Sequence, residues 1–203
     1  MNKNHEKTMK KIYSLLAAAV ITGFSATPAS AGQSYISGNV GSSWMNDTKD
    51  GLFNYGLGSG ITALGAIGVR EHCYRFEGEF GYQKNSVDKL YSPFPTINYS
   101  GNIEVVSLLA NAYWDIYTGD GVKPYLTAGV GAARVQFESI PGLSEHDSVF
   151  AYQLGAGLSI PITKGVKLDA RYRYFSTAEF SLNDGYQSRL SSNSVLLGLR
   201  FGL

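Results

Sequence analysis

The stretch YRFEGEFGYQ (74–83) decides the fold, because its side chains alternate between two chemical kinds. One set is aromatic apart from a single glycine: Tyr74, Phe76, Gly78, Phe80 and Tyr82. The intervening set is mostly charged: Arg75, Glu77, Glu79, Gly81 and Gln83. Successive side chains of a β-strand point to opposite faces of the sheet. The segment therefore predicts a strand whose two faces meet different surroundings.

The same period of two recurs along the chain, and the sequence after residue 31 shows no convincing 3.6-residue apolar stripe. The pattern is clear at 150–160, 166–175 and 193–203, and weaker at 33–44, 61–69, 102–116 and 124–135. Together with 74–83, these segments predict eight antiparallel strands.

The connections between these strands alternate between long and short. The long ones are 45–60, 84–101, 136–149 and 176–192, and the short ones are 70–73, 117–123 and 161–165. Bacterial outer-membrane barrels have short periplasmic turns and longer extracellular loops, and an even strand number puts both termini in the periplasm. The chain is too short for the sixteen strands of a large porin. The pattern predicts an all-β fold: an eight-stranded antiparallel up-and-down transmembrane β-barrel.

The charged faces should point into this barrel, because one arginine or lysine on the lipid face near the midplane costs about 2–4 kcal/mol. An eight-stranded interior is only wide enough for its own side chains. We therefore expect an interior ion network in place of an open pore, formed by Arg75, Glu77, Glu79, Asp169, Arg171, Arg173 and Arg200. We expect inward glycines to leave room for the long arginine and glutamate side chains: Gly129, Gly131, Gly155, Gly157 and Gly198.

A soluble barrel with an apolar pocket, as in lipocalins, would instead place the charged faces in water. The aromatic residues favour the membrane barrel, because they gather near strand ends as interfacial girdles do. We assign to these girdles Tyr74, Tyr82, Trp114, Tyr125, Tyr152 and Tyr174.

The N-terminus has the layout of a secretory signal peptide. Four lysines precede an apolar run at 12–24, and Ala29-Ser30-Ala31 forms an A-x-A cleavage site. The run is shorter than the ~20 residues of a transmembrane helix. We expect residues 1–31 to be a cleaved signal peptide, with Met9 as an alternative start, and residues 32–203 to form the barrel domain.

The mature part carries 13 basic and 15 acidic residues, a formal charge of −2. This balance offers no basic surface for nucleic acid. Cys73 is the single cysteine and cannot form an internal disulfide.

Four short motifs carry a family resemblance: NAYWDI (111–116), PYLTAGVGAA (124–133), FAYQLGAGLSIPI (150–162) and LDARYRYF (168–175). Over essentially all of residues 32–203, the chain resembles the opacity-protein-like branch of the small OmpA/OmpX-type, porin-like outer-membrane barrels. The resemblance implies an eight-stranded barrel that serves as an adhesin, an antigen or an envelope stabiliser. Members usually end in an aromatic residue, whereas this chain ends in Leu203, with Phe201 on the same face.

Few residues suggest catalysis or a metal site. His72 and Cys73 share a short connection, but structural zinc needs four ligands, so we interpret them as a polar turn. His146 lies in SEHDS (144–148), which holds the residue types of a hydrolase triad, although a triad is defined by geometry. We expect no enzymatic activity, no metal and no cofactor. A lipid-modifying hydrolase using His146 and a narrow porin-like channel are the alternatives.

The long loops are the part of this architecture that is free to bind partners, because the exterior meets lipid and the interior holds its own charges. In 84–101, five apolar or aromatic residues fall outside the strand pattern and are candidates for surface contact: Leu90, Tyr91, Phe94, Ile97 and Tyr99. Alternatively, they pack over the barrel mouth or extend the strands above the membrane.

We expect a non-enzymatic protein of the bacterial outer membrane that displays loops for adhesion, envelope integrity or antigenic roles. Its expected partners are outer-membrane lipid, lipopolysaccharide and, through the loops, a host or cell-surface protein or glycan.

Overall fold

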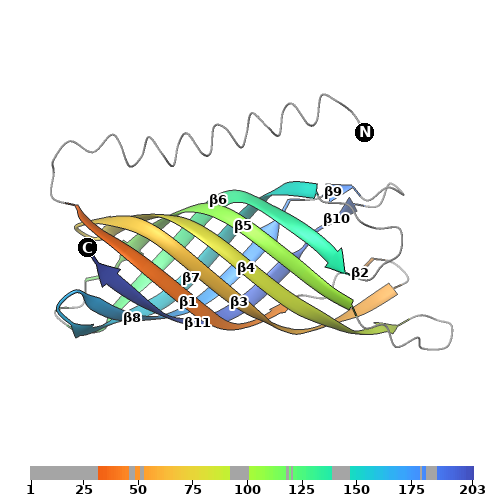
Figure 1. Cartoon of the computed structure of the whole chain (residues 1–203), viewed down its shortest axis with the longest axis horizontal. Coiled ribbons are helices and arrows are strands. Elements are labelled where there is room, and N and C mark those ends of the chain that lie inside the picture. The colour runs from red at the N-terminus through yellow and green to blue at the C-terminus, as the bar shows by residue number, and fades with distance from the viewer. Residues whose placement is uncertain are drawn as a thin grey trace, which may run out of the picture.

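A computed structural model describes residues 32–45, 49–50, 53–91, 101–117, 119, 121–138, 147–178, 180–181 and 187–203. Over these residues the chain forms eight long strands (Figure 1). They are β1 (Gln33–Met45), β3 (Phe53–Glu71), β4 (Tyr74–Tyr91), β5 (Gly101–Asp115), β6 (Lys123–Glu138), β7 (Asp147–Thr163), β8 (Val166–Thr177) and β11 (Ser191–Gly202). Three two-residue strands add to them: β2 (Lys49–Asp50), β9 (Phe180–Ser181) and β10 (Gln187–Ser188).

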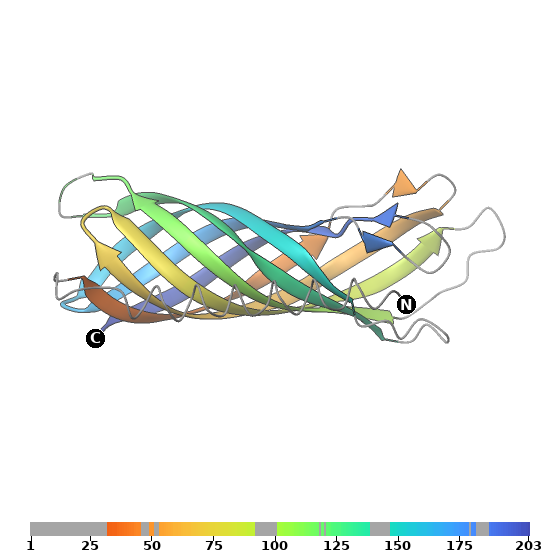
Figure 2. The same cartoon turned by 90° about the horizontal axis from the view of Figure 1, so that it is seen from above.

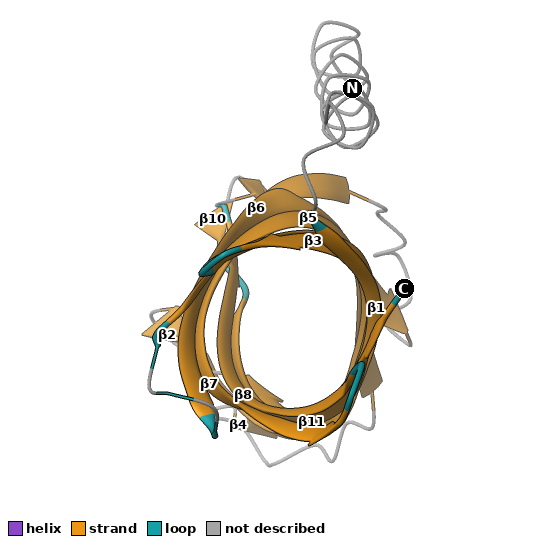
Figure 3. Cartoon of the chain, turned by 90° about the vertical axis from the view of Figure 1, so that its left-hand side faces the viewer, coloured by secondary structure: helices purple, strands orange, loops and turns teal. Residues whose placement is uncertain are grey.

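The sheet closes on itself, because β1 pairs antiparallel with both β3 and β11. Figure 3 shows the resulting ring seen from one end. Following paired residues once around the barrel leads from Arg75 to Asn85 on the same strand, an offset of 85 − 75 = 10 residues. This stagger corresponds to strands tilted by roughly 40° from the barrel axis.

The alternation read in 74–83 sets the two surfaces of the barrel. Phe80 on β4 is 56% exposed on the outside, whereas its inward neighbour Glu79 is 1% exposed. The exterior between the strand ends is an apolar belt to which every long strand contributes, as with Val40, Ile67, Phe80, Leu108, Val130, Leu154, Tyr172 and Leu197. Within the described ranges, no helix is long and apolar enough to cross a membrane.

Two of the short connections are two-residue turns at one end of the barrel, which we call the short-turn end. His72-Cys73 joins β3 to β4, with His72 in the left-handed region (φ 55°), and Lys164-Gly165 joins β7 to β8. The start of β1 and the C-terminus lie at this same end (Figure 1). At the opposite end, β3 and β4 project and β9 pairs with β10 (Figure 2).

The strands run further toward this opposite end than the apolar pattern predicted. Residues 53–60 belong to β3, and residues 84–91 belong to β4, so both predicted loops are shorter than expected. β7 likewise begins at Asp147. The apolar alternation is absent from the sequence there, yet the backbone groups still need partners and find them in the ladder. β3 and β4 pair as far as Asn54 with Tyr91, through two register shifts.

Candidate functional site

The barrel interior nearest the short-turn end is built around Arg75. Its Nε donates to Oδ1 of Asp115 at 2.9 Å, its Nη2 forms an ion pair with the same oxygen at 2.8 Å, and its Nη1 lies 3.8 Å from Oε1 of Glu77. The guanidinium lies over the rings of Tyr113 and Tyr125, at 4.2 and 4.7 Å from their centroids. This buried cation is therefore held by two carboxylates and two aromatic faces from β4, β5 and β6.

A second group of contacts crosses the middle of the lumen. Arg171 Nη2 donates to Oε2 of Glu79 at 3.0 Å, and Arg171 Nη1 donates to the Tyr113 hydroxyl at 2.6 Å. Gln153 Nε2 donates to Oε1 of Glu79 at 3.0 Å, and Arg173 Nε donates to Oε1 of Gln153. These groups come from β4, β5, β7 and β8, so they tie opposite walls of the barrel together and occupy its centre.

A third group lies beside the first at the short-turn end. Arg200 Nη2 donates to Ser159 Oγ at 2.6 Å and to Asp169 Oδ1 at 3.1 Å. On the same side, the Tyr35 hydroxyl donates to Oε1 of Glu77 at 2.7 Å.

The structure buries the seven charged residues of the expected network in the interior, each at most 7% exposed. It pairs Arg75 with Glu77, Glu79 with Arg171, and Asp169 with Arg200. Arg173 contacts Gln153 and lies over the Phe175 ring. The network also contains groups that the expected set omitted: Asp115, Tyr35, Tyr113 and Gln153. Alternation places all four inward, which is the signal that could have found them.

Two sequence interpretations need correction. Tyr125 is no girdle residue: it faces the lumen, where its ring lies 5.7 Å from that of Tyr113. The inward glycines mostly make room for other groups than arginine and glutamate. A Cβ at Gly157 would lie 2.5 Å from the Tyr125 ring, and one at Gly198 would meet Asn39.

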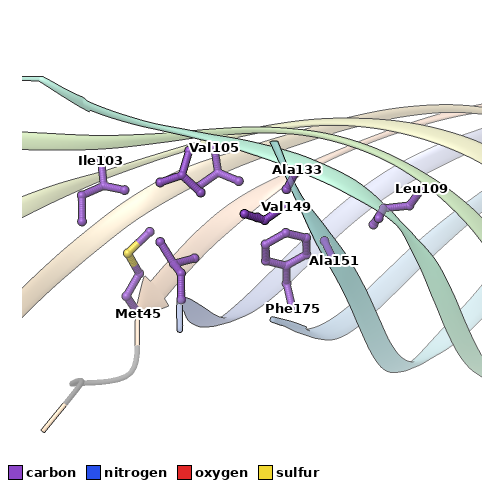
Figure 4. Packing of buried hydrophobic residues seen from close by; sticks show 10 residues of the cluster. Met45, Ile103, Val105, Leu109, Ala133, Val149, Ala151 and Phe175 are labelled. Carbon is purple, nitrogen blue, oxygen red and sulfur yellow. The ribbon is translucent and has the colours of Figure 1, made fainter. Parts of the chain in front are cut away.

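The interior changes character toward the long-loop end. There a buried apolar cluster fills the lumen (Figure 4), consisting of Met45, Ile103, Val105, Leu109, Ala133, Val135, Val149, Ala151, Phe175 and Leu190. Beside this cluster the same half of the lumen buries a hydrogen-bonded polar group, Ser43, Gln83, Asn85 and Ser192. An ion passing along the axis would have to displace the ion pairs of the short-turn half and then pass the buried side chains of the long-loop half.

Basic groups lie on the outer wall above the apolar belt, toward the long-loop end. Lys84 Nζ lies 2.8 Å from Oε1 of Glu104, which also accepts from the Tyr82 hydroxyl. Arg134 is exposed on the outer face of β6. Arg189 Nη2 donates to the Tyr152 hydroxyl at 2.7 Å. The outer wall therefore carries cations and tyrosines at one level.

The loop candidates fall partly within the described residues. Leu90 and Tyr91 belong to β4, so they are not loop residues as expected. Phe94, Ile97, Tyr99 and His146 lie outside the described residues. Cys73 is half-buried in the two-residue turn. Within the part of the chain that the structure describes, no three His, Cys, Asp or Glu side chains gather as metal ligands.

A closed barrel with an apolar exterior and a charged interior defines the class of transmembrane β-barrel proteins. The family model of the outer membrane protein beta-barrel domain matches residues 16–202, and the chain belongs to that family. It is therefore an outer-membrane β-barrel protein, and the eight-stranded antiparallel fold expected from the sequence is confirmed.

Comparison with known proteins agrees with this assignment. The chain is 24% identical over 238 aligned positions to the outer membrane protein PagN of Salmonella typhimurium, covering 95% of this chain and 99% of PagN. Its fold is similar to that of Neisserial surface protein A, with a TM-score of 0.63, 20% identity, and coverage of 84% of this chain and 97% of the other. OprG from Pseudomonas aeruginosa gives a TM-score of 0.55 at 10% identity, with coverage of 85% and 96%.

Proposed function

We propose that this protein is a non-enzymatic surface protein whose closed barrel is a rigid scaffold that displays extracellular loops. The observation that supports this best is the filled interior, with ion pairs in one half and the apolar cluster in the other. A lumen occupied in this way leaves the long-loop end as the part of the molecule free to bind a partner.

Orientation follows from export. We infer that residues 1–31 direct secretion and are removed, and that the short-turn end with both termini faces the periplasm. The long-loop end then faces outward. This proposal is consistent with the start of β1 and the C-terminus lying at one end (Figure 1).

Lipid is the first partner. The apolar belt fits the hydrocarbon core, and Tyr82 and Tyr152 suit the interface above it. Arg134, Lys84 and Arg189 lie just beyond, on the outer face, where they would meet the phosphates of lipopolysaccharide. We infer that these cations anchor the barrel in the outer leaflet.

The second partner would bind the loops. We propose that the segments around 46–52, 92–100, 139–146 and 178–190, between the long strands, contact a host or cell-surface protein or glycan. Phe94, Ile97 and Tyr99 are the apolar candidates in the second of these segments. Their type fits the aromatic anchors common in protein interfaces.

Accessibility of the loops gives the test of this function. Protease added to intact cells should cut within the four segments and spare the turns at His72-Cys73 and Lys164-Gly165.

Binding of cells to a host-cell layer should fall when residues 92–100 are replaced by a Gly/Ser linker, while the barrel keeps its heat-modifiable gel mobility. Cleavage at the short turns with protected loops would contradict both the orientation and the surface role.

Conductance should be low, because buried ion pairs and buried apolar side chains occupy the described lumen. Purified protein in a planar bilayer is expected to show little or no steady current, with a sixteen-stranded porin as the positive control. Large, stable, porin-like steps would contradict the closed barrel and favour the channel alternative.

A further inference from the structure

Like charges face each other across the ladder at the mouth of the short-turn end. Arg70 on β3 pairs directly with Arg75 on β4, and Lys167 on β8 pairs directly with Arg200 on β11. Alternation points all four side chains inward. Like charges directly opposite in a sheet are destabilising, so two such pairs in one mouth need compensation.

The buried carboxylates of the interior are balanced by buried arginines. Four arginines (Arg75, Arg171, Arg173 and Arg200) and four acids (Glu77, Glu79, Asp115 and Asp169) are buried in the described part of the lumen and balance each other. Three further inward cations lie at the mouth: Arg70, Lys123 and Lys167. Among the described residues, Arg70 has only the 3.8 Å contact with Asp115, Lys123 Nζ lies 5.7 Å from the Tyr117 ring centroid, and neither lysine forms an ion pair.

Asp115 shows how the acids are shared. Its Oδ1 accepts a hydrogen bond from Nε of Arg75 and lies 2.8 Å from Nη2 of the same residue, whereas its Oδ2 lies 3.8 Å from Nε of Arg70, too far for a hydrogen bond. Asp169 is held by Arg200 at 3.1 Å. Lys167 lies within electrostatic range of the cations Arg70, Lys123 and Arg200 and of the acid Asp115.

Donors at this mouth also lack acceptors. The buried Nε of Arg70 and the buried Nε and Nη1 of Arg200 have no hydrogen-bond partner among the described residues. Arg200 is 4% exposed, so these are enclosed donors. The side chains of Arg70 and Lys167 remain partly open, with Arg70 at 26%, and can be reached from the short-turn end.

We propose that the mouth at the short-turn end is a binding site for a phosphate group, held by Arg70, Lys123 and Lys167. Phosphate carries between one and two negative charges near neutral pH and several acceptor oxygens, so one group can serve three cations from different strands. Binding would relieve the repulsion of Lys167 by Arg200 and of Arg70 by Arg75. The source is either free phosphate or a phospholipid head group of the adjoining leaflet.

The test is titration of the folded full-length mature chain in zwitterionic micelles. Inorganic phosphate, against chloride at matched ionic strength, should bind saturably and raise the melting temperature. The variant Lys167→Gln should weaken phosphate binding by about ten-fold, which corresponds to one charge-assisted hydrogen bond. Its fold is checked by heat-modifiable gel mobility, and without phosphate it should be at least as heat-stable as the wild type. The matched control is Lys164→Gln, which removes the same charge from the exposed turn and should bind as the wild type does.

A second arm separates the sources of phosphate. Nanodiscs with phosphatidylglycerol are compared with nanodiscs of phosphatidylcholine, and the Arg70 and Lys167 side chains are followed by NMR. A response to phosphatidylglycerol alone would support the site with a lipid head group as its ligand. Equal weakening in Lys164→Gln and Lys167→Gln, or no saturable response to either source, would overturn the proposal. None of these outcomes depends on loop binding, so the surface role can fail while the site stands.

Discussion

Replacing Glu79 by glutamine is expected to lower the free energy of unfolding by about 3–5 kcal/mol, because it leaves Arg171 buried without a counter-charge. Both side chains of this pair are almost fully buried in the lumen, at 1% and 2% side-chain exposure. Glutamine has nearly the same shape, so the loss reflects charge and not a cavity. Reversible urea unfolding in phospholipid vesicles, followed by tryptophan fluorescence, measures it.

The matched control is Glu104→Gln, the same substitution in the more exposed Lys84–Glu104 pair on the outer wall. That pair is worth at most about 1 kcal/mol, because surface ion pairs are weak. The double variant Glu79→Gln with Arg171→Leu should be more stable than Glu79→Gln alone, since it removes the uncompensated cation. Similar small losses for Glu79→Gln and Glu104→Gln would show that water reaches the lumen and screens its charges.

The eight strands could be predicted from the sequence because lipid and lumen impose opposite chemistry on successive residues. In 74–83 the pattern is unbroken, and each residue faces the side predicted. The strand ends could not be predicted, because beyond the membrane both faces tolerate polar residues. Residues 84–91 read as a loop by composition, yet they pair with β3 to satisfy their backbone.

For the interior side chains, the inward orientation could be predicted from the sequence, but the ion-pair and hydrogen-bond partners could not. Alternation places Arg75 and Arg171 inward, but their partners depend on the offset of ten residues around the barrel, which no local pattern encodes. Tyr125 shows that alternation is a better guide than position along the strand. Its place near a strand end suggested the girdle, whereas alternation along β6 turns it inward, where its ring lies against the guanidinium of Arg75. The mouth cations were also missed, because Arg70 and Lys167 become opposed to Arg75 and Arg200 only once the strands are paired.

Placing an arginine on the apolar belt should show directly which surface meets lipid. Leu154 lies near the middle of β7 and is 54% exposed, and Ile162 lies near the short-turn end of the same strand and is 55% exposed. In lipid vesicles, Leu154→Arg is expected to destabilise the protein by about 2–4 kcal/mol, because it forces a cation to the bilayer midplane. Ile162→Arg should cost only about 0–1 kcal/mol, since its side chain reaches the interface.

The two variants add the same charge to one strand at different depths, which makes the comparison informative about a membrane. Leu154 pairs with Tyr174, and Ile162 lies at the register irregularity between Pro161 and Thr163, so the change in net charge cancels while the local ladder differs. Urea unfolding in vesicles gives the two free energies, and refolding yield gives an independent readout of insertion. Equal effects at 154 and 162 would mean that the belt is not graded by depth, contrary to a strand that crosses a bilayer. A larger loss at 162 than at 154 would place the membrane midplane nearer the short turns and contradict the position inferred for the apolar belt.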